Sequence, residues 1–175
     1  GLGDVYKRQT PSLAITSTNV AIANVTTANE NAADASFTIT LSTASGLAVT
    51  FDYESSNGTA TAGADYTAVS GSVTIAAGST TGTIAVPVLA DSLDEANETV
   101  IMSLTNAANA SFTDDDATLT ITDDDATPSL SIADVSGNET AGNREFTVTL
   151  SAASGRDVTV NYATSNGTAT AGADY

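Results

Sequence analysis

The stretch Phe37–Tyr66, FTITLSTASGLAVTFDYESSNGTATAGADY, contains the pattern that decides the fold. Apolar residues alternate with small polar residues over Phe37–Leu41 and again over Val49–Tyr53. The turn-forming sequence Ala44–Gly46 separates the two runs. A period of two is typical of β-strands that bury one face, so the stretch predicts two strands joined by a short connection.

The same alternation recurs along the first two thirds of the chain. Further strands are expected over Val73–Ile75, Ile84–Val88, Val100–Leu104 and Leu119–Ile121, after an opening strand around Leu13–Val25. Together these make seven strands, A to G, which predicts an all-β, seven-stranded, immunoglobulin-like antiparallel β-sandwich. Pro87 falls within the fifth strand, so that strand is expected at a sheet edge or at a bulge.

The chain also repeats itself. Phe37–Tyr66 returns as Phe146–Tyr175, with 22 of the thirty aligned residues identical, and TPSL at Thr10 returns at Thr127. The sequence therefore predicts a first repeat over residues 10–126 and a truncated second repeat over residues 127–175. Residues 1–9, GLGDVYKRQ, match nothing downstream and are interpreted as a non-native leader.

The composition excludes several classes of function. The formal net charge is −17, with 21 acidic and four basic residues, and there is no His, Cys or Trp. Phosphate binding needs a basic surface, so nucleic acid is not expected as a partner. Without His or Cys the chain offers no Ser-His or Cys-His nucleophile and no thiolate or imidazole metal site. The sequence therefore predicts a protein that is not an enzyme. It also contains no apolar run long enough to cross a membrane.

The acidic residues are predicted to gather at one end of the sandwich. Successive antiparallel strands reverse direction, so alternate connections lie at the same end. Glu30 lies in the A–B connection, Asp65 follows strand C, Asp91–Glu98 forms the E–F connection, and Asp123–Asp125 follows strand G. All of these share one end, whereas Asp114–Asp116 lies in the F–G connection at the other.

Carboxylates crowded at one end repel one another, by roughly 1 kcal/mol per pair at 4 Å in water and about 4 kcal/mol near a protein surface. Residues 10–126 contain no Lys or Arg that could offset this repulsion. Ca²⁺ accepts six to eight oxygen ligands in irregular geometry, so a bound calcium ion would offset the repulsion among these carboxylates. The alternative is a solvated acidic face, which is how most acidic runs behave.

Three motifs, SNGTATAGADY, GSVTIAAGSTTGTIAVPVLADSLDEANETV and ATLTITDDD, occur in this order and resemble the Calx-beta domain family. The resemblance covers residues 10–126 as a whole domain and residues 127–175 as the first half of another. The family is known from sodium–calcium exchangers and large bacterial surface proteins. It implies a sandwich that binds several calcium ions at one tip.

Carried over by position, the family's metal ligands fall on Glu30, Asp65, Asp91, Glu95, Asp123, Asp124 and Asp125. Glu98 matches a further acidic position of the family. Ala90 stands where the richest calcium-binding members have Asp, which implies fewer or weaker ions. In the second repeat Glu139 and Asp174 match, and this half-domain is expected neither to bind calcium well nor to fold stably alone.

The resemblance implies a calcium-binding structural or adhesive repeat of a large extracellular or cell-surface bacterial protein. Calcium would stiffen the junction between repeats, and the partners would be neighbouring repeats and an unknown surface target. Two alternatives are a calcium-sensing domain of a membrane transporter and a non-catalytic module of a secreted hydrolase.

Overall fold

The computed structural model describes residues 17–27, 29–31 and 34–175. The chain divides into two compact units, one comprising residues 1–90 and 98–122 and the other residues 91–97 and 123–175. The predicted leader, residues 1–9, lies outside the described residues.

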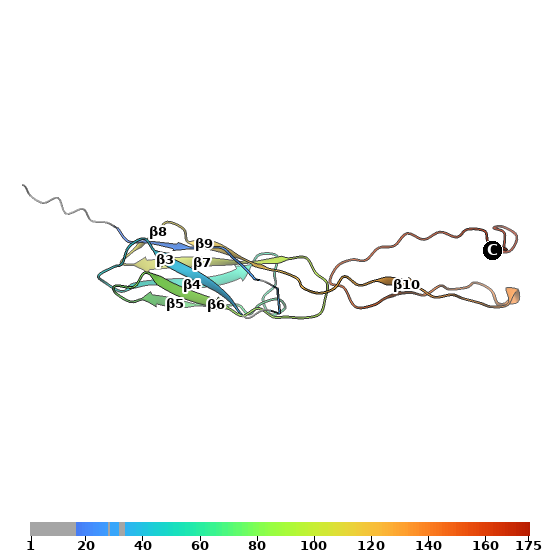
Figure 1. Ribbon diagram of the computed structural model, residues 1–175, viewed down its shortest axis with the longest axis horizontal. Coiled ribbons are helices and arrows are strands. Elements are labelled where there is room, and N and C mark those ends of the chain that lie inside the picture. The colour runs from blue at the N-terminus through green and yellow to red at the C-terminus, as the bar shows by residue number, and fades with distance from the viewer. Residues whose placement is uncertain (1–16, 28, 32–33) are drawn as a thin grey trace, which may run out of the picture. The chain divides into compact units, whose positions relative to one another are not determined.

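The first unit is a β-sandwich whose strands run along a common direction (Figure 1). One sheet has the order β6 (Thr81–Val86), β3 (Ala35–Leu41), β1 (Asn19–Ile22), β8 (Ser111–Phe112). The other has the order β2 (Val25–Thr26), β9 (Asp116–Ile121), β7 (Glu98–Ala108), β4 (Val49–Asn57), β5 (Ser70–Ile75). The predicted sandwich is therefore confirmed.

The opening strand differs from the prediction of one strand over Leu13–Val25. From residue 17 onward it consists of β1 in one sheet and β2 in the other. Both pieces pair in parallel, β1 with β8 and β2 with β9. Two residues, Ala23 and Asn24, separate the pieces, so the chain crosses from the interior of one sheet to the edge of the other.

The other six predicted strands correspond to β3, β4, β5, β6, β7 and β9. β6 lies at the edge of its sheet, as Pro87 indicated, although the strand ends at Val86, just before the proline. β4 continues past Tyr53 to Asn57, and the register of its pairing with β7 shifts between Thr50 and Asp52.

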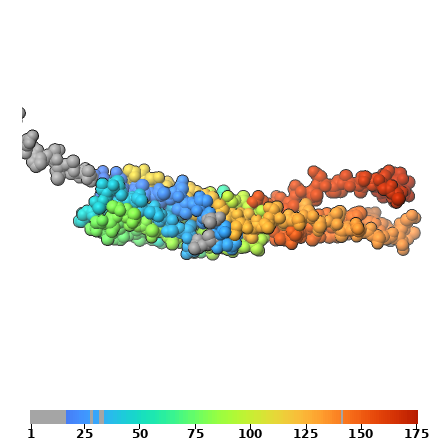
Figure 2. All heavy atoms as spheres, viewed as in Figure 1, coloured from blue at the N-terminus to red at the C-terminus, as the bar shows by residue number. Residues whose placement is uncertain are grey.

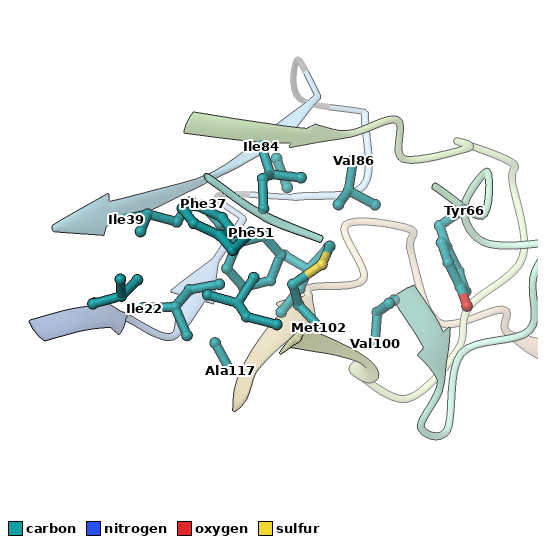
Figure 3. Packing of buried hydrophobic residues seen from close by; sticks show 14 of the residues in the cluster. Ile22, Phe37, Ile39, Phe51, Tyr66, Ile84, Val86, Val100, Met102 and Ala117 are labelled. Carbon is teal, nitrogen blue, oxygen red and sulfur yellow. The ribbon is translucent and has the colours of Figure 1, made fainter. Parts of the chain in front are cut away.

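The core follows from the alternation of side chains. β3 has the strictly alternating burial expected of a strand with one face in the core, and Phe37 and Ile39 are completely buried. Figure 3 shows Phe37 and Phe51 gathered with Met102 between the sheets. Each such side chain stabilises the fold by about 1.5–3 kcal/mol relative to its exposed state.

The short strand β8 also contributes to this core. The rings of Phe51 and Phe112 meet edge to face, with centroids 6.4 Å apart. Phe112 thereby packs the F–G connection against the cluster, and such ring pairs add about 0.5–1.5 kcal/mol beyond area burial.

The second unit contains little regular structure. β10 (Leu130–Ile132) pairs with β11 (Val148–Leu150), and Glu139–Ala141 forms one turn of 3-10 helix. Exposed large apolar side chains are common here; they are Leu130, Ile132, Val135, Phe146, Val148, Val158, Val160, Tyr162 and Tyr175. Among the described residues no helix is long and apolar enough to cross a membrane.

Candidate metal centre

Asp65 lies in a turn that is built by its own side chains. Asp65 Oδ2 accepts a 2.6 Å hydrogen bond from the backbone N–H of Thr61. Asn57 Oδ1 accepts hydrogen bonds from Ala62 N (3.0 Å) and from the phenol of Tyr66 (2.8 Å). Gly63, at φ +91°, provides the left-handed residue that closes the turn. The Asp65 carboxylate is therefore held in a fixed position.

This turn lies against the start of β7. The carbonyl oxygen of Thr99 accepts hydrogen bonds of 3.0 Å from both Gly58 N and Ala60 N. Glu98 precedes Thr99, and Asp65 and Glu98 each offer a carboxylate oxygen within 4.8 Å of the other. Two carboxylates at this separation repel each other by roughly 1–4 kcal/mol, which favours a shared cation.

Glu30 enters the same end of the first unit from the A–B connection. Three residues before it, Thr27 N donates a 2.9 Å hydrogen bond to the carbonyl oxygen of Thr120. Thr27 also accepts a hydrogen bond from Thr122 N (3.1 Å), so the connection is fixed at the end of β9. The Glu30 side chain is 7% exposed, which is unusual for a carboxylate unless it is paired or binds a cation.

The pairing of the strands confirms the parity argument within the first unit. Glu98 pairs with Ile121, so the start of β7 and the end of β9 lie together. Asp116 begins β9 and therefore lies at the opposite end. The segments 91–97 and 123–125 follow Ala90 and Thr122 directly, and Thr122 lies at the end that carries Glu30 and Glu98.

In the second unit, two hydrogen bonds from backbone N–H groups to side-chain oxygens join the E–F connection to the start of the Asp triplet. Glu95 N donates to Asp123 Oδ1 (3.1 Å), and Asp123 N donates to Asn97 Oδ1 (3.2 Å). Asp123 and Asp125 each offer a carboxylate oxygen within 4.8 Å of the other. Two segments 28 residues apart in sequence thus form one acidic cluster.

Asp125 shows that this cluster fits a cation. Its Oδ2 atom is buried and accepts no hydrogen bond from the described part of the chain. A buried acceptor without a donor costs about 1–3 kcal/mol, more when it is charged. A hard cation is the kind of group that such an oxygen binds, and the all-oxygen donor set suits Ca²⁺.

Among the described residues, the predicted ligands Asp91 and Asp124 belong to no group of three carboxylates close enough to share an ion. Asp91 is exposed, and its Oδ1 accepts a 2.7 Å hydrogen bond from Leu93 N, which forms a turn at the start of the E–F connection. Asp124 is exposed, unlike its neighbours Asp123 and Asp125. Their part in metal binding remains a prediction.

Asp94 was missed by the sequence argument and is the most buried acid of the E–F connection, at 6% exposure. Its Oδ1 accepts a hydrogen bond from Thr127 Oγ1 (3.1 Å), and its carbonyl accepts one from Gly155 N (3.2 Å). The only sequence signal was its place within DSLDEANE.

Arg156, in the second repeat, lies close to two of these acids, although residues 10–126 themselves contain no Lys or Arg. Its Nη2 lies 3.8 Å from Asp94 Oδ1 and 3.9 Å from Asp123 Oδ2, and it donates a hydrogen bond to the carbonyl of Glu95. The residue belongs to the second repeat, which is why the composition of residues 10–126 did not reveal it. Because its side chain is 52% exposed, the ion pairs contribute about 0–1 kcal/mol.

Comparison with known proteins identifies the family to which this chain is similar. The model of the Calx-beta domain matches residues 16–125 and again residues 126–175. No curated protein matches the sequence. The apo form of the Calx CBD1 domain is 21% identical, with a TM-score of 0.57, over 63% of this chain and 100% of that domain.

Two larger structures are similar to the same extent. CBD12 from CALX1.2 is 22% identical, with a TM-score of 0.59, over 74% of this chain and 56% of that one. The calcium binding domain CBD12 of CALX1.1 is 21% identical, with a TM-score of 0.56, over 61% of this chain and 45% of that one. At this level of identity the likeness concerns the fold, whereas the family match extends over both repeats: the chain belongs to the Calx-beta domain family.

Proposed function

We propose that the chain is a calcium-binding structural repeat of an extracellular or cell-surface protein. The observation that carries the proposal is the buried Asp125 Oδ2, an acceptor to which the described residues supply no donor, within a pair of close carboxylates. Family membership and the gathering of acids at one end support the same conclusion.

The proposed ligands are Glu30, Asp65, Asp91, Glu95, Asp123, Asp124 and Asp125, with Glu98 added. Within the first unit we assign Asp65 and Glu98 to one ion position, and within the second unit we assign Asp123 and Asp125 to another. Asp94 is left out because no ligand position of the family falls on it; its carboxylate accepts a hydrogen bond from Thr127 and pairs with Arg156.

In this proposal the residues of the chain supply both geometry and charge. The Asn57–Tyr66 turn orients Asp65, and the Glu95–Asp123 hydrogen bond holds the E–F connection against the Asp triplet. Calcium would offset the repulsion among these carboxylates, so the tip would become more rigid when the ion binds. Because Asp123–Asp125 leads directly into the second repeat, this would stiffen the junction between repeats.

The similarity of the two repeats, with 22 of thirty aligned residues identical, favours a structural role. An array of similar repeats is a means of building length, and neighbouring repeats are then the first partners of each repeat. The strongly negative chain is not proposed to bind nucleic acid, and no catalytic role is proposed.

Calcium titration by calorimetry of the whole chain and of two variants tests the proposal. Asp125→Asn is expected to abolish at least one binding step, whereas the control Asp114→Asn, at the opposite end of the sandwich, is expected to bind as the parent does. Calcium binding with unchanged heat and affinity in Asp125→Asn would contradict the assignment, and no binding by the parent would contradict the function.

A calcium-sensing domain of a membrane transporter is the second candidate. It is favoured by the similarity to the Calx CBD1 domain and to the calcium binding domain CBD12 of CALX1.1. Small-angle scattering of the intact parent protein, with calcium and with chelator, distinguishes the two candidate functions. A maximum dimension that decreases in chelator supports a structural stalk. Transmembrane segments flanking the repeats would support a sensor.

A further inference from the structure

One of the two sheets of the first unit has no charged residue in its strands. These strands are β6, β3, β1 and β8, and none of them contains Asp, Glu, Lys or Arg. The other sheet has acids on three of its strands, Asp52 and Glu54 on β4, Glu98 on β7 and Asp116 on β9. In a chain with a formal net charge of −17, a neutral sheet is a distinct kind of surface.

Small hydroxyl and methyl side chains form the outward face of this neutral sheet. Side chains alternate across a strand, so the residues between the buried positions of β3 and β6 point outward. All of these residues are exposed; they are Ser36, Thr38, Thr40, Thr81, Thr83 and Ala85. Figure 2 shows the segment that contains β6, coloured green, at the surface of the first unit. These side chains carry no charge that would repel another acidic protein.

β6 lies at the edge of the neutral sheet and leaves one side of its backbone open. Leu41 N donates a 2.8 Å hydrogen bond to the carbonyl oxygen of Thr80, so every second residue from Thr80 onward directs its backbone groups to β3. The residues between them, Thr81, Thr83 and Ala85, direct theirs to the free edge. Within the described part of the chain, β3 is the only strand that pairs with β6.

The open edge of β6 is closed at one end. Pro87, directly after β6, has no N–H group, and its carbonyl oxygen accepts a 2.9 Å hydrogen bond from Thr67 N. The open part of the edge therefore ends at Ala85. Asp34 precedes β3 and lies beside this closed end, because β3 begins opposite the last residue of β6.

The other sheet edges of the first unit are less suited to pairing. Natural sheets protect their edges with short strands, charges, prolines or bulges, and β8 and β2 have only two residues each. β5 has six residues, but its neighbour β4 places Asp52 opposite Ser72 and Glu54 opposite Ser70. Figure 1 shows β5 and β6 along one side of the first unit and β8 along the other. Among the edges that the structure describes, β6 is the one that is both long and free of neighbouring acids.

We propose that β6 pairs with β6 of a second copy of this chain, so that the neutral sheets of two first units become one continuous sheet. A two-fold axis places the two strands antiparallel, centred on Thr83. Thr83 then faces Thr83 of the second copy, and Thr81 faces Ala85 of the second copy. Each facing pair exchanges two backbone hydrogen bonds, which gives about six in total.

Charge identifies the occupant of this edge as a second copy. Two chains of net charge −17 repel each other over most of their surfaces, and the neutral sheet is where they can approach most closely. A basic partner would instead be drawn to the acidic end of the sandwich or to the sheet that carries the acids. The edge is also complementary to itself, because an antiparallel pair needs the same donors and acceptors on both strands.

A single introduced thiol tests the register, because the chain contains no cysteine. Thr83→Cys places two thiols opposite each other, at a Cα separation of about 5.5 Å that is suitable for a disulfide. In the control Thr81→Cys the two thiols are four residues out of register, about 14 Å apart along the strands. Under mild oxidation we expect Thr83→Cys to form a covalent dimer at least ~10-fold faster than Thr81→Cys, since a disulfide needs Cα atoms within about 7 Å.

Sedimentation equilibrium of the whole chain tests the noncovalent dimer. The parent is expected to associate, and to do so more strongly as salt is added, because salt screens the repulsion between copies. Thr83→Pro removes an N–H of the open edge and none of the bonds to β3. It is expected to weaken association at least ~10-fold, because each copy loses a hydrogen bond to the other.

Thr74→Pro is the matched control, at the edge formed by β5. Ser55 N donates a 2.9 Å hydrogen bond to the carbonyl oxygen of Val69, so by the same alternation the N–H of Thr74 points to the free edge of β5. This variant is expected to associate as the parent does. Thr83→Asp retains the N–H and places two carboxylates opposite each other, so it should also weaken association, with circular dichroism confirming that each variant is folded.

Three results would overturn the proposal: a parent chain that stays monomeric at every soluble concentration, association unchanged in both Thr83→Pro and Thr83→Asp, and equal rates of cross-linking in Thr83→Cys and Thr81→Cys. The substituted residues lie outside the proposed calcium ligands, so calorimetric titration of Thr83→Pro should give the calcium binding of the parent. A failure of the pairing is therefore distinguishable from a failure of the calcium proposal.

Discussion

The phenol of Tyr66 donates a 2.8 Å hydrogen bond to Asn57 Oδ1, from a ring that is 1% exposed. Tyr175 and Asn166 make the same bond at 2.8 Å, with the ring half exposed. The turn geometry is thus a property of the local sequence, whereas the burial of the ring depends on the rest of the sandwich. The two repeats therefore contain matched pairs of positions that differ mainly in burial.

Asn57→Ala removes the acceptor for both Tyr66 and Ala62 N. A buried hydroxyl without its partner costs about 1–3 kcal/mol, so the free energy of unfolding should fall by that amount in urea titration followed by circular dichroism. The control Asn166→Ala, at the exposed copy of the turn, should change it by less than about 0.5 kcal/mol. Equal losses in the two variants would contradict the role assigned to burial.

Gly58→Ala tests how closely the turn approaches β7. A Cβ atom at Gly58 would lie 2.5 Å from the carbonyl oxygen of Thr99, a backbone atom that cannot move aside without breaking its hydrogen bonds. We expect a loss of about 1–3 kcal/mol in stability, typical of forced contacts in a packed region.

Gly167→Ala is the matched control for this variant, because a Cβ atom there meets nothing within 4 Å. Its free energy of unfolding, obtained from the thermal melt, should match that of the parent within about 0.5 kcal/mol. A stable Gly58→Ala variant would show that the turn does not press against Thr99.

The strands of the sandwich were predictable because each buries alternate residues, as Phe37, Ile39 and Leu41 do in β3. The division of the opening strand into β1 and β2 was not, since pieces of four and two residues are too short to carry a period. β8 was missed for the same reason: only Phe112 reaches the core.

For the candidate site, strand parity predicts the end of the sandwich at which an acid lies but not its depth. It placed Glu30 and Glu98 at the same end, yet it gave no reason for Asp94 to be more buried than Asp91. That difference arises from Thr127 and Arg156, which lie beyond the first repeat. Contacts between repeats cannot be predicted from the alternation of apolar and polar residues within one repeat.

Calcium should raise the thermal stability of the first repeat. A ligand present at one hundred times its dissociation constant adds about 2.7 kcal/mol per site to the free energy of unfolding. For a domain of this size, that corresponds to roughly 10 °C in the melting temperature measured by calorimetry. The Asp125→Asn variant should lose part of the increase and Asp114→Asn none of it. An identical melt in calcium and in chelator would contradict the proposed metal centre.

Arg156→Leu introduces the residue that the first repeat has at the equivalent position, Leu47. It removes a positive charge that lies 3.9 Å from Asp123 Oδ2. A cation near a proposed calcium ligand opposes ion binding by about 0.5–1 kcal/mol at surface dielectric, so calcium should bind roughly 2–5-fold more tightly at low salt. The difference should disappear near 1 M salt, where the Debye length is about 3 Å.

Arg156→Lys keeps the charge and should bind calcium as the parent does in the same calorimetric titration. Weaker calcium binding in Arg156→Leu than in Arg156→Lys would mean that the positive charge orders the Asp94–Asp123 cluster for the ion rather than competing with it.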